Sequence, residues 1–181
     1  ENYVNVAAFA DVFRVGLRVA PRWYVMASST VKGYSSAMIP KGLAALLVDG
    51  TASAVGTYSN TSPDAEMISY LQTAVGASYQ ATPKLTVGGR LKYLNGLANV
   101  TTESSSAIVE IDNNYKIKLS AQAIVKTSGV PSSAQSYQLG DNLGNNSGWG
   151  LDLGFSYKFM DKLTVSGALN DLGSITWRNA T

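Results

Sequence analysis

The sequence predicts an all-β protein, an antiparallel transmembrane β-barrel, and two observations favour this class. Apolar and polar residues alternate along most of the chain, as they do on strands with one apolar and one polar face. Charged residues make up only 14% of the 181 residues, whereas a soluble domain carries about 25%. Because hydrophobic residues are an ordinary 45%, the missing charge is replaced by Ser, Thr, Asn and 17 Gly.

The first alternating segments lie near the start of the chain. Residues 12–20 place Phe13, Val15 and Leu17 on one face and Arg14 and Arg18 on the other. A turn at residues 21–22 follows, and then the alternation resumes. Several segments last about 9–12 residues, which is the length that a tilted strand needs to cross a bilayer. A short apolar stretch at residues 40–49, with Pro40 at its start and Gly50 after it, predicts one short helix.

Two hairpins repeat one pattern. Residues 76–94 and 154–172 both read Gly-x-Ser-Tyr-x-x-x-x-Lys-Leu-Thr-Val-x-Gly-x-Leu-x-x-Leu, at an offset of about 78 residues. Each copy predicts a strand, a tight turn and a second strand. Residues 115–125 alternate as well, after a turn at Asn113-Asn114. The long polar stretches at residues 50–64 and 129–148 predict long loops on the side opposite the tight turns, which is the arrangement of outer-membrane barrels.

The alternation assigns two faces to the sheet. In a membrane barrel the apolar face meets lipid and the polar face lines the lumen, whereas in a soluble β-sandwich the apolar face is the core. Long strands, low charge and aromatic residues near the strand ends favour the barrel. The predicted lipid-facing residues are Phe13, Val15, Leu17, Leu85, Val87, Leu91, Leu151, Leu153 and Phe155. The candidate lumen-lining residues are Arg14, Arg18, Arg90, Lys92, Asp152 and Lys158.

The composition excludes several kinds of site. The chain has no His and no Cys, so it offers no Ser–His–Asp or Cys–His nucleophile, no thiolate or imidazole metal site and no disulfide. A net charge of +2 is too small for a nucleic-acid groove. The sequence therefore predicts a non-enzymatic protein without cofactor, metal ligands or nucleic acid. Asp171-Leu172-Gly173 reads as a bend in a strand, not as a catalytic acid.

The basic residues on the polar face allow two interpretations. They could attract an anionic solute or a carboxylate-bearing lipid into the lumen. Alternatively, they form ion pairs with Glu66, Glu110 or Asp152 that hold neighbouring strands in register. Ion pairing is favoured, because charges inside a barrel need partners.

Three segments resemble a known family. The hairpin at residues 156–165, the strand at residues 169–177 and residues 85–98 resemble an uncharacterised family of outer-membrane barrels from Bacteroidota. That family is distantly similar to long-chain fatty-acid-transporter barrels and to the barrel subunit of the type IX secretion apparatus. The likeness covers residues 39–177. It implies a barrel of about 14 strands, of which residues 1–181, with about eight strands, would be a portion forming a single β-barrel domain.

The expected function follows from the resemblance and from the missing chemistry. It is an accessory subunit of a cell-envelope assembly in the bacterial outer membrane, engaged in protein secretion, surface-protein handling or barrel biogenesis. Outer-membrane lipid and other outer-membrane or periplasmic subunits are its expected partners. The alternative is a channel for hydrophobic or anionic small solutes, and a soluble β-sandwich adhesin is a third interpretation.

Overall fold

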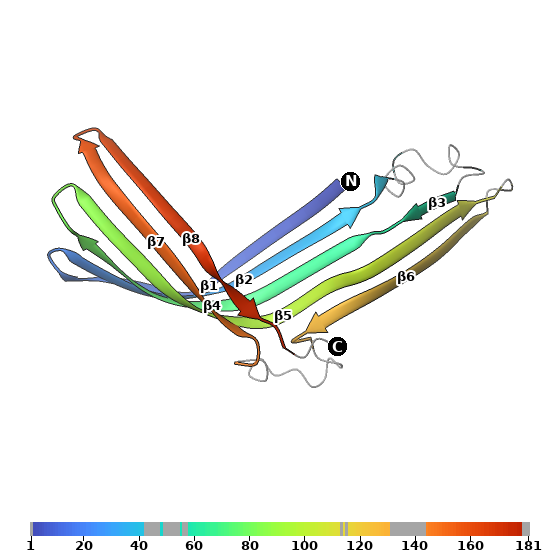
Figure 1. The fold of residues 1–181 in the computed structure, drawn as a ribbon, viewed down its shortest axis with the longest axis horizontal. Helices are drawn as coiled ribbons and strands as arrows, with labels where there is room; N and C mark the ends of the chain where they lie inside the picture. Colours follow the sequence, from blue (N-terminus) through green and yellow to red (C-terminus); the bar gives the residue numbers. More distant parts are fainter. Residues whose placement is uncertain are drawn as a thin grey trace.

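The protein folds as one antiparallel sheet of eight strands (Figure 1). The computed structural model describes residues 2–41, 48, 55, 58–112, 114, 116–130 and 144–178, with the backbone alone at 58–61 and 119. The all-β prediction is therefore confirmed for this part of the chain. The strands are β1 (Asn2–Ala20), β2 (Trp23–Ile39), β3 (Tyr58–Thr61), β4 (Asp64–Gln80), β5 (Leu85–Ile111), β6 (Ile117–Ser128), β7 (Ser147–Met160) and β8 (Leu163–Thr176).

The predicted helix at residues 40–49 falls on a stretch where only Pro40, Lys41 and Val48 are described, so most of it lies outside the described residues. The same holds for much of the two predicted long loops. Among the described residues, no helix is long and apolar enough to cross a membrane.

The long strand β5 organises the sheet. The strand order is β1-β2-β4-β5-β7-β8, and β3 and β6 also pair with β5. The first part of β5 pairs with β7, from Leu85↔Tyr157 to Asn95↔Ser147. Its second part pairs with β6, from Asn99↔Ser128 to Ile111↔Ile117. Strands β6 and β7 therefore lie end to end along one edge of β5, and the sheet divides into two arms (Figure 1).

Three tight turns lie at one end of the sheet, as the sequence predicts (Figure 1). They join β1 to β2 at residues 21–22, β4 to β5 at residues 81–84 and β7 to β8 at residues 161–162. The opposite end also carries a tight turn, between β5 and β6. There Asp112 Oδ1 accepts hydrogen bonds from the backbone N–H groups of Asn114 and Lys116, both at 2.8 Å. This places Asn114 in the predicted turn, while Asn113 is outside the described residues.

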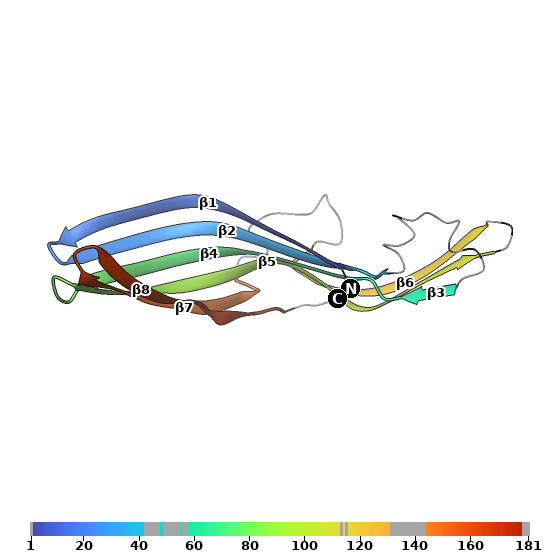
Figure 2. The same cartoon turned by 90° about the horizontal axis from the view of Figure 1, so that it is seen from above.

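The sheet curls strongly (Figure 2). Lys32 Nζ on β2 lies 3.6 Å from Asp171 Oδ1 on β8. In a flat sheet these strands would be about 19 Å apart, because four spacings of about 4.8 Å separate them. The face that carries Lys32 and Asp171 is therefore concave. The sheet is not closed, since β1 and β8 each pair with one strand among the described residues; a closed barrel thus stays a prediction.

The convex face is apolar and exposed. One row of directly paired residues crosses six strands on it: Val15, Ala27, Val75, Leu91, Leu151 and Leu172. All nine residues predicted to face lipid belong to this face by their register, and all are exposed except Leu85, which is half-buried. Such a large exposed apolar surface requires a covering medium or partner.

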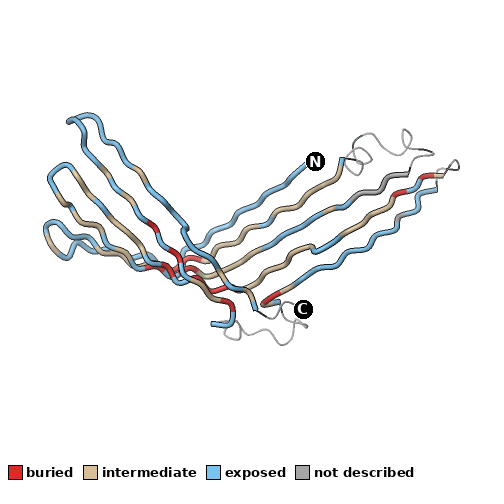
Figure 3. Tube along the Cα trace, viewed as in Figure 1, coloured by how far each residue is buried: buried red, intermediate tan, exposed pale blue. Residues whose placement is uncertain are grey.

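The concave face is lined by many small residues, and larger side chains lie over them. A Cβ on Gly16 would collide with the ring of Tyr24, and a Cβ on Gly76 would lie 2.6 Å from Arg90 Cγ. Glycine at these positions thus lets Tyr24 and Arg90 lie across the neighbouring strands. Most of the buried residues gather where the strands bend, in the middle of the sheet, and a smaller group that includes Val109 and Ile111 lies at the far end of β5 (Figure 3).

Gly173→Ala is expected to destabilise the fold by about 1–3 kcal/mol. A Cβ at Gly173 would collide with the backbone of β7 at Trp149 and Gly150, which cannot move without breaking its pairing with β5. Gly33→Ala is the matched control, because its Cβ would meet only Ala8 O at an ordinary 3.9 Å. Urea unfolding of the two variants checks the difference, and equal stability would contradict the close approach of β8 to β7.

Candidate functional site: a charged cluster on the concave face

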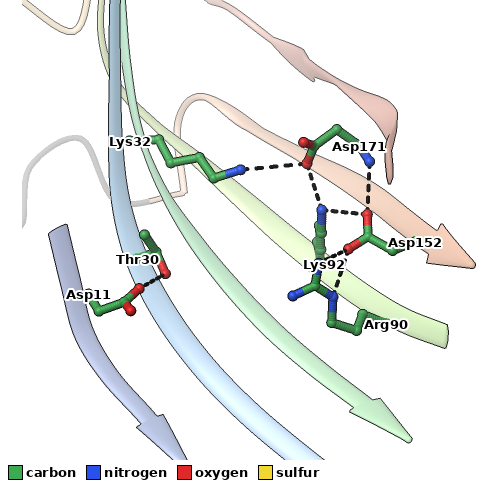
Figure 4. A network of polar contacts seen from close by, with 7 residues as sticks. All are labelled: Asp11, Thr30, Lys32, Arg90, Lys92, Asp152 and Asp171. Carbon is green, nitrogen blue, oxygen red and sulfur yellow. Dashed lines mark hydrogen bonds and ion pairs between the residues drawn. The ribbon is translucent and has the colours of Figure 1, made fainter. Parts of the chain in front are cut away.

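Five charged side chains meet on the concave face, and we call them the charged cluster (Figure 4). Lys32 comes from β2, Arg90 and Lys92 from β5, Asp152 from β7 and Asp171 from β8. They are far apart in the sequence, and the curl of the sheet brings them together. The cluster ties four strands across the concave face.

Asp152 is the centre of the charged cluster. Its Oδ2 accepts from Arg90 Nε at 2.7 Å and lies 2.5 Å from Arg90 Nη2. Its Oδ1 lies 2.5 Å from Lys92 Nζ and accepts the backbone N–H of Asp171 at 2.8 Å. Both oxygens are thus occupied, and the side chain is only 5% exposed. A carboxylate with both oxygens so engaged serves as a structural anchor and has no free lone pair directed at a substrate.

Lys92 joins the two carboxylates. Its side chain is 2% exposed, and Nζ contacts Asp152 Oδ1 at 2.5 Å and Asp171 Oδ1 at 2.6 Å. A buried ammonium is tolerated only with such partners. Lys32 Nζ also lies 3.6 Å from Asp171 Oδ1, and the Asp171 side chain is 56% exposed.

A β-bulge turns Asp171 towards the concave face. In the pairing of β7 with β8, Leu151 faces Leu172 and Leu153 faces Leu169, so Asn170 and Asp171 together oppose the single residue Asp152. Asp171 has φ 57°, a left-handed conformation that Asp tolerates better than most residues. The predicted bend is thus present at Asp171 itself, and it delivers a cluster residue that sequence reasoning had treated as a bend alone.

A second polar group lies beside the charged cluster, on β1 and β2. Thr30 Oγ1 donates to Asp11 Oδ1 at 2.6 Å, and Arg14 Nη2 lies 3.0 Å from Asp11 Oδ2. The register shifts between Asp11 and Phe13. Because of this bulge, Asp11 is on the concave face although Phe13, two residues later, is on the convex face. Simple alternation cannot place Asp11, and neither Asp11 nor Lys32 is among the residues that the sequence pattern singles out.

The structure places all six predicted lumen residues on the concave face, but it brings only three of them together. Arg90, Lys92 and Asp152 form ion pairs, in agreement with the favoured interpretation, while neither Glu66 nor Glu110 pairs with these cations in the described part of the chain. Arg14 pairs with Asp11, and Lys158 lies 3.7 Å from Asp161 near the tight turn. Arg18 is exposed and close to the same end.

The charged cluster borders a cavity of about 530 Å³ on the concave face. Asp11, Arg14, Thr30, Lys32, Gln72 and Asp171 are among its lining residues. Over the described residues, no three acidic, His or Cys side chains are grouped so that they could hold a metal ion. The charged cluster and its neighbours thus form a polar, partly cationic recess on the concave face of the sheet.

Fold and site together define a class of protein: a curled antiparallel sheet with an exposed apolar outer face and an ion-paired polar inner face. The chain matches, over residues 1–181, a family model described as "Family of unknown function (DUF5723)", and it belongs to that family. No curated protein and no solved structure matches the chain.

Proposed function

We propose that the chain forms part of the wall of an outer-membrane β-barrel and works as a non-enzymatic subunit of a cell-envelope assembly. The observation that carries the first part is the exposed apolar convex face. Val75 is 57% exposed and Trp149 is 61% exposed, although both belong to rows of directly paired residues that cross neighbouring strands. Lipid would cover this face, and the concave face would line the interior.

Aromatic side chains border this apolar face at both ends, and we call the region between them the apolar belt. Trp23 and Tyr79 pack together near the tight turns with ring centroids 4.7 Å apart, and Tyr93 and Trp149 pack at the other border at 5.2 Å. Along β7, the ten steps from Trp149 to Phe159 measure about 33 Å, which a tilt of about 40° reduces to about 25 Å. The apolar band of an outer-membrane barrel has the same height, and it is also bordered by aromatic residues on both sides.

The inner face supports a structural role over an enzymatic one. The carboxylates of Asp11 and Asp152 on this face are engaged by Arg90, Lys92, Thr30 and Arg14. A chain without His or Cys also lacks the usual nucleophile and base pairs. Beyond the apolar belt, the second part of β5 continues with β6 as a second arm (Figure 1). Such an arm outside the bilayer would offer a surface to partner subunits. Co-purification of partners from native membranes is the expected result, and consistent isolation alone would contradict the subunit role.

Cysteine labelling tests whether the apolar belt meets lipid. The chain has no Cys, so single-cysteine variants report one position each. With the protein in vesicles, Leu91→Cys on the convex face is expected to resist a water-soluble maleimide and to react after solubilisation in urea. Arg18→Cys, exposed on the concave face, is the control and should react in both states. Rapid labelling of Leu91→Cys in vesicles would contradict the proposal, because Leu91 is 50% exposed in the isolated sheet and would stay open to the reagent only if lipid did not cover it.

A channel for small anionic solutes is the second candidate function, and the partly cationic cavity favours it. Swelling or conductance measurements with the protein in lipid separate the two candidates. Solute-dependent conductance would support the channel, whereas an electrically silent protein that retains its partners would support the accessory subunit.

A further inference from the structure

We propose that the cavity on the concave face binds a small organic anion with a hydrogen-bond donor next to its carboxylate, such as an α-hydroxy carboxylate. This proposal adds a ligand to the second candidate function, the channel for small anionic solutes. It rests on that function only for the route by which the anion reaches the cavity. Two independent observations carry it: an excess of one positive charge in the charged cluster and an unpaired buried acceptor beside it.

The charged cluster has one cation too many. Lys32, Arg90 and Lys92 contribute three positive charges, and Asp152 and Asp171 contribute two negative ones. The neighbouring Arg14 and Asp11 balance each other at 3.0 Å. The excess resides on Lys32, because Asp171 Oδ1, the carboxylate oxygen 3.6 Å from its Nζ, is already held by Lys92 at 2.6 Å.

Lys32 is also poorly hydrated for an ammonium group. Its side chain is 14% exposed, and its other described contact is the Tyr70 ring, with Nζ 6.0 Å from the ring centroid. A half-buried ammonium with so little compensation favours a further anionic partner. Because Lys32 lines the cavity, a carboxylate placed there would supply it.

Gln72 provides the second observation. This residue lies on β4, lines the same cavity and is 5% exposed. Its Oε1 is buried and accepts no hydrogen bond from the part of the chain that the structure describes. Buried acceptors are rarely left unpaired, because losing the hydrogen bond to water is unfavourable. A donor on the ligand would satisfy it once the Gln72 side chain, which lines the cavity, turns its Oε1 into the cavity.

The register of β2 and β4 places Lys32 and Gln72 next to each other on the same face. Gln72 is paired with Thr30, and Lys32 is paired with Tyr70, so Lys32 and Gln72 are diagonal neighbours on β2 and β4. Diagonal neighbours on one face have Cα atoms about 7–8 Å apart. In the proposed complex an α-hydroxy carboxylate bridges these two side chains, with its carboxylate on Lys32 Nζ and its hydroxyl donating to Gln72 Oε1. A simple carboxylate would satisfy the lysine alone.

Binding of three probes to the purified protein in detergent micelles tests the proposal by calorimetry or ligand-observed NMR. Glycolate has both features, acetate has the carboxylate alone, and ethylene glycol has the donors alone. We expect glycolate to bind about five- to tenfold more tightly than acetate, the effect of one hydrogen bond, and ethylene glycol not to bind measurably.

Two variants separate the two contacts. Lys32→Met should abolish binding of both carboxylates, whereas Gln72→Leu should reduce glycolate to the affinity of acetate without lowering the melting temperature, because it removes an unpaired acceptor. Lys158→Met, on the same face but outside the cavity, is the matched control and should bind like the unaltered protein.

Equal affinity for glycolate and acetate, a preference that survives in Gln72→Leu, or no binding of either anion by the folded protein would each overturn the proposal. In the last case water alone satisfies Gln72. The measurement needs no bilayer, so its failure is distinguishable from failure of the membrane proposal, which the cysteine labelling decides.

Discussion

Asp152→Asn is expected to destabilise the protein by about 3–5 kcal/mol, the largest effect we anticipate for a single side chain. The substitution removes the negative charge that faces both Arg90 and Lys92 at 2.5 Å. Lys92 is 2% exposed and would keep only Asp171 as an anionic partner. Unfolding in urea, followed by tryptophan fluorescence with the protein in lipid or detergent, measures the loss.

Two further variants define the interpretation of this result. Lys92→Met should cost less than Asp152→Asn, because Asp152 then keeps Arg90 and the backbone N–H of Asp171. Asp161→Asn should cost almost nothing, since its side chain is fully exposed and lies 3.7 Å from Lys158. If Asp152→Asn unfolded no more easily than Asp161→Asn, the charged cluster would not hold the strands together.

Val75→Arg should cost about 2–4 kcal/mol in a bilayer, provided that the convex face meets lipid. Val75 lies within the apolar belt on β4, in the row that includes Leu91 and Leu151. In water the same substitution would be nearly neutral, within about 0.5 kcal/mol, because the side chain is 57% exposed. The free energy of unfolding from lipid vesicles therefore reports on the medium around this face.

Ile124→Arg is the matched control for that experiment. Ile124 is 51% exposed on β6, which pairs with the second part of β5 outside the apolar belt. We expect no measurable effect there. If both substitutions were neutral in vesicles, the apolar belt would not lie in the hydrocarbon, and a protein partner would have to cover it.

Much of the fold was predictable because strand periodicity is a local property. The alternation from Phe13 to Leu17 and from Leu151 to Phe155 placed both sets on one face, and the register confirms that they share it. The repeated hairpins are also confirmed: Tyr79 faces Val87 in the first copy, and Tyr157 faces Val165 in the second. Turn residues such as Pro21 and Asp161 mark the strand ends correctly.

The charged cluster was only partly predictable. Arg90 and Asp152 were both assigned to the polar face, and Asp152 was named as a possible partner. That they are directly paired residues follows from β5 pairing with β7, which lies far along the chain. Lys32 was not singled out, since its partner Asp171 is four strands away and becomes a neighbour only when the sheet curls.

The sequence by itself determined the strands, their two faces and the absence of His and Cys chemistry, because these depend on composition and on the two-residue period of a strand. The tertiary structure decided where that period breaks. By the repeat, Asp171 corresponds to Tyr93, which packs against Trp149 on the convex face. The bulge opposite Asp152 reverses this direction and places Asp171 against Lys92 instead. This bulge depends on the pairing of β7 with β8 and on ion pairs between distant residues, so it becomes visible only once the sheet is assembled and curled.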